Sequence, residues 1–223
     1  MRIDIRLIRL SALVAIAAGG CTPPPQQPLA PLPCPAMDFS PAGPAAPAPA
    51  EAATATSVPP RQADWAVRPA RPWRHIVIHH SATDRGSAEQ FDLAHRRRGF
   101  DELGYHFVIT NGDGGPDGAV QVGPRWRRQK WGAHCGGTPN NEYNDYGIGV
   151  CVVGDFRSRL PSPRQLASLE RLVRYLCAVY DIPPRRVIGH GEAPGAATVC
   201  PGAALSEYIH FTLQPSLADD AGS

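Results

Sequence analysis

Three side chains able to bind a soft divalent metal are widely spaced in this chain of 223 residues. His79 ends one short apolar run and His190 ends another, while Cys200 lies in a loop rich in glycine, alanine and proline. Two imidazoles and a thiolate suit Zn²⁺, which takes nitrogen and sulfur donors in a tetrahedral shell. Three protein ligands would leave the fourth position open to water, as in catalytic rather than structural sites. A lone histidine at a strand end is more often a hydrogen-bonded core residue, so spacing alone leaves two interpretations open.

Apolar runs and turn signals predict the elements that must position these residues. Strands are predicted at 73–80, 105–110, 119–122, 147–154 and 186–190, with 119–122 pairing back on 105–110 as a hairpin. Helices are predicted at 87–98, from Ser162 to about residue 180, and at 203–213. Strands that alternate with helices, plus one hairpin, indicate an α/β fold in which helices flank a central mixed sheet.

The helix after Ser162 has the clearest signals. Ser162 is its predicted N-cap, Pro163 occupies the first turn, and Gln165 completes a capping box. Its apolar face is predicted to consist of Leu166, Leu169, Leu172, Val173, Leu176 and Val179.

The segment 125–146 has no periodicity, and loops of this length in compact domains are usually functional or disordered. Its aromatic and amide residues could line a groove for sugars or peptide, or simply pack in the core or on the surface. These candidates are Trp126, Trp131, Asn140, Asn141 and Tyr143.

Composition divides the chain into four parts. Residues 1–21 combine Arg2, Arg6 and Arg9 with an apolar segment too short to span a bilayer, as in a signal peptide. The segment ends in AGGC, which resembles the lipobox of bacterial lipoproteins and makes Cys21 the candidate lipidation site, although a plain secretory signal is the alternative. Residues 22–72 are rich in Pro and Ala and predict a disordered linker. Residues 73–215 are the predicted catalytic domain, and 216–223 a flexible tail.

The formal net charge of +2 gives no indication of nucleic-acid binding. Two short basic runs, 96–98 and 125–130, are either solvated surface or contacts for anionic cell-wall polymers. Six cysteines are too few for a disulfide scaffold. Cys151 and Cys177 are predicted core residues, and whether Cys34 and Cys135 form a disulfide stays open.

Five sequence pieces resemble the zinc-dependent N-acetylmuramoyl-L-alanine amidase family, which includes phage lysozyme-type amidases and peptidoglycan recognition proteins. They are IVIHHSAT (76–83), GF with GYHFVI (99–100 and 104–109), GAH (132–134), IGVCVVG (148–154), and GHGE leading to TVCPG (189–192 and 198–202). Their family order over about 130 residues argues against chance similarity.

The resemblance implies that His79, His190 and Cys200 bind one zinc ion. It selects His79 over its neighbour His80, and adjacent strand residues face opposite ways. It also implies that a zinc-activated water is the nucleophile, and that Tyr105 and Thr198 are catalytic hydrogen-bond donors to the water or the oxyanion.

Further positions are less specific. His134 matches a histidine near the family's active site, so it is either an accessory residue that orients substrate or water, or a plain loop residue. Trp131 and Asn141 are candidate substrate-binding residues. Glu192 is a candidate acceptor for the second ring nitrogen of His190. Recycling amidases resemble this family but carry a glutamate at the position of Cys151 and lack the tyrosine. Because this chain has Tyr105 and no such glutamate, it resembles the phage and recognition-protein branch.

The implied function is hydrolysis of the bond between the muramic acid lactyl group and L-alanine of peptidoglycan. A non-catalytic peptidoglycan-binding module and a zinc peptidase acting on stem peptides are the alternatives. We expect an exported monomer that contacts the membrane only through its N-terminal lipid.

Overall fold

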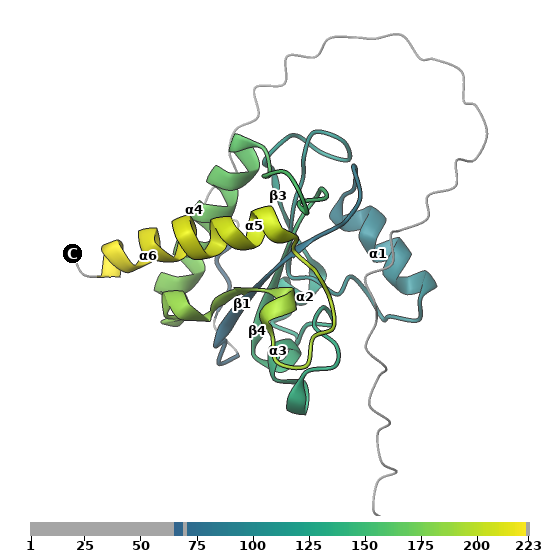
Figure 1. Ribbon diagram of the computed structural model, residues 1–223. Helices are drawn as coiled ribbons and strands as arrows, with labels where there is room; N and C mark the ends of the chain where they lie inside the picture. Colours follow the sequence, from purple (N-terminus) through teal and green to yellow (C-terminus); the bar gives the residue numbers. More distant parts are fainter. Residues whose placement is uncertain (1–64, 69–70, 222–223) are drawn as a thin grey trace, which may run out of the picture.

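The computed structural model describes residues 65–68 and 71–221, whose core is one five-stranded sheet in the order β3-β2-β4-β1-β5 (Figure 1). The strands are β1 (His75–His80), β2 (Phe107–Ile109), β3 (Val120–Val122), β4 (Gly147–Val152) and β5 (Val187–Gly189). β1 pairs in parallel with β4 and β5, and β2 pairs in parallel with β4. β3 is antiparallel to β2, as the hairpin prediction required. The predicted α/β fold with a mixed sheet is confirmed.

Helices flank this sheet. They are α1 (Ala88–Arg97), α2 (Pro124–Arg127), α3 (Glu142–Asp145), α4 (Pro163–Tyr180), α5 (Ala203–Tyr208) and α6 (Gln214–Ala221), with a π-helical turn at Ile209–Leu213 between the last two. The predicted capping box of α4 is present, since Ser162 Oγ accepts the Gln165 N–H at 3.1 Å and Gln165 Oε1 accepts the Ser162 N–H at 3.2 Å. The α4 face is shorter than predicted, because Val179 is exposed and Leu166 only half-buried.

The two faces of the sheet are covered differently. Ile76 and Ile78 of β1 join the main core, to which α4, α5 and α6 contribute apolar residues. Val77 and His79, which alternate with them, point to the other face because successive side chains of a strand face opposite ways. On that face α1 packs Phe91 against Val108 and Cys151, over β2 and β4. The end of β1 that carries His79 is therefore left for loops to cover.

The folded domain begins before the predicted boundary at residue 73. Trp65 is fully buried in the main core, where its ring meets Tyr175 of α4 edge-on at 5.6 Å between centroids. Its carbonyl accepts the indole N–H of Trp126 at 2.9 Å. The end of the Pro/Ala-rich segment is thus part of the domain.

The C-terminal boundary at residue 215 is also wrong. α6 continues to Ala221, and Leu217 packs in the main core, 5% exposed. The backbone carbonyl of Ser216 accepts a hydrogen bond from Arg174 of α4 at 3.3 Å. These contacts fix residues that the sequence interpretation assigned to a flexible tail.

The predicted signal peptide, Cys21, Cys34 and most of the predicted linker lie outside the described residues. Cys135 is a free, buried thiol. Within the described part of the chain, no helix has both the length and the apolar character needed to cross a lipid bilayer.

Candidate metal centre

The sheet topology brings His79 and His190 together. β1 and β5 are parallel neighbours with Ile78 in register with Gly189, so their following residues meet at the same edge of the sheet. His79 lies near the end of β1, and His190 opens the 3₁₀ turn His190–Glu192 directly after β5. The two imidazole rings are 4.5 Å apart between centroids. Cys200 reaches them from the loop that precedes α5.

The three predicted ligands form one compact group. One ligand atom from each of His79, His190 and Cys200 lies within 4.8 Å of the others, and all three side chains are buried. His79 Nδ1 is 3.7 Å from Cys200 Sγ. His190 Nδ1 is buried without a hydrogen-bond partner, which is costly unless another group satisfies it. Two nitrogens and one sulfur, one of them an orphaned buried nitrogen, fit a zinc ion.

The backbone around Cys200 is fixed by short hydrogen bonds. The His80 N–H donates to Cys200 Sγ at 3.4 Å, and such a donor favours the thiolate form. Thr198 Oγ1 accepts the Cys200 N–H at 3.2 Å, and the Cys200 carbonyl accepts the Gly191 N–H at 2.6 Å. The loop therefore holds the sulfur in place through its own main chain.

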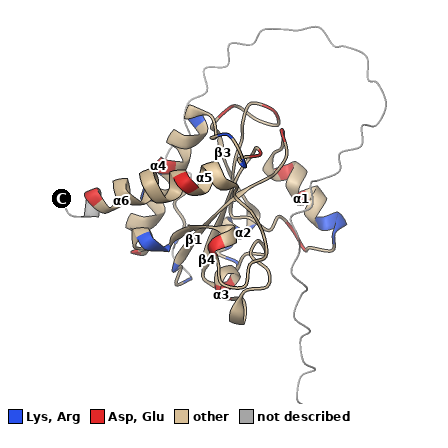
Figure 2. Ribbon diagram, viewed as in Figure 1, with Lys and Arg blue, Asp and Glu red and all other residues tan. Residues whose placement is uncertain are grey.

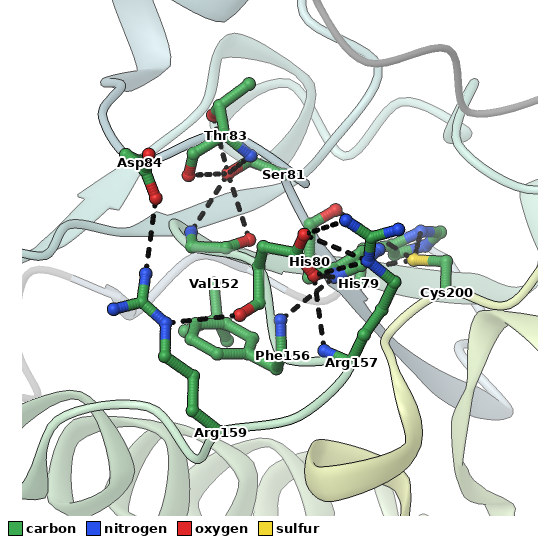
Figure 3. A network of polar contacts seen from close by, with 12 residues as sticks. His79, His80, Ser81, Thr83, Asp84, Val152, Phe156, Arg157, Arg159 and Cys200 are labelled. Carbon is green, nitrogen blue, oxygen red and sulfur yellow. Dashed lines mark hydrogen bonds and ion pairs between the residues drawn. The ribbon is translucent and has the colours of Figure 1, made fainter.

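His80 faces away from the ligand group, as strand alternation predicts. Its Nδ1 accepts the Phe156 N–H at 3.4 Å and lies 3.8 Å from Asp155 Oδ1 (Figure 3). The same network continues through Arg157, Arg159 and Asp84 at the surface. His80 thus contributes its backbone N–H to the centre and its ring to the neighbouring loop.

Ser81 joins the ends of the two central strands. Its Oγ accepts the Gly154 N–H at 3.0 Å and the Thr83 hydroxyl at 2.8 Å (Figure 3). Because Gly154 follows β4 and Ser81 follows β1, this single hydroxyl ties together the strand ends beside the ligand group. The serine and threonine of the HHSAT piece are therefore structural supports of the centre.

His134 and Tyr105 lie against His79. His134 Nδ1 is 3.1 Å from His79 Nε2, and the Tyr105 ring is 5.1 Å from the His79 ring between centroids. Tyr105 precedes β2 and does not form part of it, and its side chain is buried. The structure therefore places both predicted residues beside the ligand group, from two loops far apart in sequence.

Burial controls the protonation of these histidines. Desolvation, followed by the nearby imidazoles, lowers the pKa of His79 well below its usual value, and desolvation likewise lowers the pKa of His134. Desolvation lowers the pKa of His106, whose ring lies 5.7 Å from that of His134, to about 3. These rings are therefore neutral at neutral pH, the form in which an imidazole binds metal.

Charged residues lie on helices and loops, whereas the five strands consist of apolar residues, glycine, histidine, cysteine and one glutamine (Figure 2). The basic run 125–130 is only partly at the surface, where Arg127 and Arg128 are exposed. Arg125 is buried and donates to the carbonyls of Leu103 and Trp131 at 2.7 and 2.8 Å. Lys130 pairs with Asp101. Arg125 and Lys130 therefore fix the loop.

The other groove candidates have mixed positions. Trp126 is a fully buried core residue. Trp131 is 48% exposed and packs beside Lys130, whose Nζ is 5.3 Å from the ring centroid. Asn141 is exposed, and its side chain bonds Asp145 and Asn144. Asn141 is held within its own loop, and the Trp131 ring also has the guanidinium of Arg71 6.0 Å from its centroid, so neither residue is shown against the ligand group.

The interpretation of Glu192 as an acceptor for His190 is wrong. Glu192 Oε1 lies 2.9 Å from His210 Nε2, on the π-helical turn, while His190 Nδ1 is unpartnered. The Glu192 carboxylate, two residues after His190, therefore contacts the π-helical turn between α5 and α6.

Two supporting residues escaped the sequence analysis. Asn144 holds the backbone of His134 through a 2.8 Å hydrogen bond to its N–H. His95 of α1 lies 5.4 Å from Tyr105 between ring centroids, and its Nδ1 accepts the Gly104 N–H at 2.9 Å. Only the concentration of asparagine in an aperiodic loop pointed towards Asn144, and no pattern distinguished His95 from a surface helix residue.

Comparisons with known proteins give the chain's relatives. A family model described as N-acetylmuramoyl-L-alanine amidase matches residues 69–203. Peptidoglycan-recognition protein 2 of Holotrichia diomphalia is 29% identical over 143 residues, covering 56% of this chain and 68% of that protein. The N-acetylmuramoyl-L-alanine amidase of Sus scrofa is 31% identical over 144 residues, covering 63% of this chain and 21% of that protein. The solved structure of the endolysin amidase LysCS from Clostridium intestinale superposes with a TM-score of 0.53 at 29% identity, covering 64% of this chain and 84% of that one.

Proposed function

Because the chain belongs to the N-acetylmuramoyl-L-alanine amidase family, we propose that it hydrolyses the amide bond between the lactyl group of N-acetylmuramic acid and L-alanine of peptidoglycan. The observation that carries the proposal is the convergence of His79, His190 and Cys200, whose ligand atoms lie within 4.8 Å of one another. The relatives include both amidases and recognition proteins, and the group of three candidate ligands supports the amidase assignment.

The three side chains would hold one zinc ion and leave one coordination position open. When bound, the ion supplies activation of a water molecule and polarisation of the scissile carbonyl. The chain's own residues then have two tasks. They must keep the ligands deprotonated, which burial of His79 and the N–H donated to Cys200 Sγ favour, and they must stabilise negative charge on the carbonyl oxygen.

Tyr105 and Thr198 are the proposed donors to that oxygen. Tyr105 packs against the His79 ring, and a phenol hydroxyl can donate one hydrogen bond. Thr198 Oγ1 accepts the Cys200 N–H at 3.2 Å, which orients the hydroxyl and leaves its proton free to donate. Neither group carries a charge, so their stabilisation depends on exclusion of water around the bond.

Metal content and product analysis test this proposal. The purified protein should contain one zinc per chain and release stem peptides with a free N-terminal alanine from peptidoglycan, supplied in separate assays as intact sacculi and as soluble muropeptides. Cys200→Ala and His79→Ala should lose the zinc and the release together, because three protein ligands are the minimum for the site. Mass spectrometry of the products, with and without a chelator, provides the measurement.

Each other outcome identifies an alternative. Zinc-loaded protein that binds peptidoglycan without releasing peptide would be a recognition module. Cleavage within the stem peptide would identify a zinc peptidase. Release at the wild-type rate by either ligand variant would overturn the ligand assignment.

We also propose that the protein is exported and attached to the cell envelope through a lipid on Cys21. The arginines and short apolar segment before AGGC support this location, where peptidoglycan is accessible. Cys21→Ala should move the protein from the membrane fraction to the soluble fraction while its amidase activity persists. Retention of that variant in the membrane fraction would contradict the lipid anchor.

A further inference from the structure

The two nitrogens of the His79 ring have different neighbours. Nδ1 lies 3.7 Å from Cys200 Sγ and faces the ligand group, whereas Nε2 lies 3.1 Å from His134 Nδ1. A neutral imidazole carries one proton, so binding a metal through Nδ1 requires that proton to be on Nε2. The group that contacts Nε2 therefore decides whether His79 is in the tautomer that can bind metal through Nδ1.

The hydrogen-bond partner of His134 determines the position of its own proton. His134 Nε2 lies 3.2 Å from the carbonyl oxygen of Gly147, and a carbonyl can only accept a hydrogen bond. The proton of a neutral His134 must then be on Nε2, which leaves Nδ1 as an acceptor. That acceptor faces His79 Nε2, so His79 Nε2 is the donor of the 3.1 Å bond.

We propose that His134 is a positioning residue that holds His79 in its Nε2–H tautomer, so that Nδ1 is presented to the metal. The hydrogen bonds form a relay in one direction, from His79 to His134 and from His134 to the Gly147 carbonyl. This inference rests on the metal centre of the proposed function, and it assigns His134 to ligand orientation instead of substrate contact.

Close packing confines the His134 ring to a single position. A Cβ on Gly149 would come within 2.4 Å of His134 Cδ2, and a Cβ on Gly132 would come equally close to the same atom. Gly149 lies inside the central strand β4, where glycine is unfavourable, in register with Val77 of β1. Its lack of a side chain makes room for the ring between β4 and the loop.

The backbone that carries the ring is fixed separately. Asn144 Oδ1 accepts the N–H groups of His134 and Cys135 at 2.8 and 2.9 Å, and Asn144 Nδ2 donates to the Cys135 carbonyl at 3.1 Å. One amide side chain thus satisfies three backbone groups of the loop. A ring confined by glycines on a backbone held by Asn144 has little freedom to turn away from His79.

The other histidine ligand lacks equivalent support. His190 Nδ1 is the buried, unpartnered nitrogen assigned to the metal, and within the described residues no hydrogen bond reaches the other nitrogen of this ring, because Glu192, two residues on, lies against His210. Within the described residues, the hydrogen bond from His79 to His134 is therefore the only one that orients a histidine of the candidate ligand group. Loss of a hydrogen-bond partner that orients a metal ligand typically lowers metal affinity by about 10- to 100-fold.

The first test reads the tautomer directly. Nitrogen-15 NMR of the metal-free full chain at neutral pH, with histidine labelled and His79 assigned through the spectrum of His79→Gln, reports which ring nitrogen carries the proton. We expect Nε2–H on both His79 and His134. A protonated Nδ1 on His79 would overturn the proposal, and this measurement requires neither zinc binding nor a folded His134 variant.

The second test measures zinc affinity by chelator competition in two matched variants. His134→Asn keeps an acceptor near the position of Nδ1, whereas His134→Leu has a similar volume and no acceptor. We expect the zinc Kd to rise about 10- to 100-fold in His134→Leu and much less in His134→Asn. Circular dichroism of the metal-free variants checks that both are folded.

The outcomes separate this inference from the function on which it rests. Wild-type protein that takes up no zinc contradicts the metal centre, whatever the tautomer is. Wild-type zinc binding together with an unchanged Kd in a folded His134→Leu leaves the centre intact and refutes the positioning role. Equal losses in the two variants would likewise refute the acceptor role of Nδ1.

Discussion

Gly149→Ala is expected to damage the metal centre from a position that does not touch it. The new Cβ would lie 2.4 Å from His134 Cδ2 and 2.6 Å from Cγ, whereas ordinary contacts begin at 3.4 Å. The ring must therefore retreat by about 1 Å or the strands must separate. A shift of this size away from β1 would break the 3.1 Å bond between His79 Nε2 and His134 Nδ1.

Two costs follow from this displacement. Overpacking a close-packed site costs about 1–3 kcal/mol of unfolding free energy, against which replacement of a strand glycine by alanine returns about 0.5–1 kcal/mol. Loss of the partner that orients a metal ligand reduces affinity about 10- to 100-fold, or about 1.4–2.8 kcal/mol. Gly149→Ala should therefore lower zinc affinity more than it lowers the stability of the metal-free protein.

The assay combines urea unfolding of the metal-free protein with zinc competition against a chromophoric chelator. Gly136→Ala is the matched control, because a Cβ at Gly136 meets nothing within 4 Å. Gly149→Ala in a His134→Ala background should lose much of its cost, since the ring it would strike is gone. Zinc affinity equal to that of wild type, or strictly additive costs in the double variant, would refute the reasoning.

Three further predictions address other parts of the fold. Trp65→Ala should lower the free energy of unfolding by about 3–5 kcal/mol in urea titrations, because it empties a fully buried site, while leaving zinc affinity unchanged; a cost near zero would contradict the domain boundary. The pKa of His106 is about 3 in the folded protein and about 6.5 when unfolded, so the unfolded chain takes up its proton first. Its own contribution to stability should fall by about 2 kcal/mol between pH 7 and pH 5, in addition to the losses from His79 and His134. His106→Gln should show a shallower pH dependence of the urea midpoint in the metal-free protein, and an unchanged slope would reject this assignment. Tyr105→Phe should reduce kcat about 100-fold with zinc content intact, by the usual cost of losing one oxyanion donor, and a wild-type kcat would remove Tyr105 from the mechanism.

Sequence patterns predicted the sheet and the grouping of the three candidate ligands because both leave local or family-wide traces. The apolar runs defined the strands to within a few residues, and the capping box of α4 is a purely local signal. The grouping of His79 with His190 follows once β1 and β5 are parallel neighbours, since the ends of parallel strands share one edge.

What the sequence did not predict depends on contacts between distant residues. Glu192 was assigned to its chain neighbour His190, but the π-helical turn brings His210 to it instead. Trp65 is a single aromatic residue after a Pro/Ala-rich segment, and only the tertiary packing with Tyr175 shows its role. The role of His134 depends on which of its nitrogens meets the Gly147 carbonyl, which no pattern encodes. The extension of α6 was different, because Leu213 and Leu217 keep a helical spacing that could have been recognised.

The burial of Trp65 has a mechanical consequence. Trp65 packs with α4 on the face of the sheet opposite His79, and nine residues separate it from the start of β1 at His75. A pulling force applied from the N-terminal side would have to extract the indole from the core before any load reached the strand that carries His79. The buried Trp65 thus lies, along the chain, between the N-terminal side of the domain and the residues of the candidate metal centre.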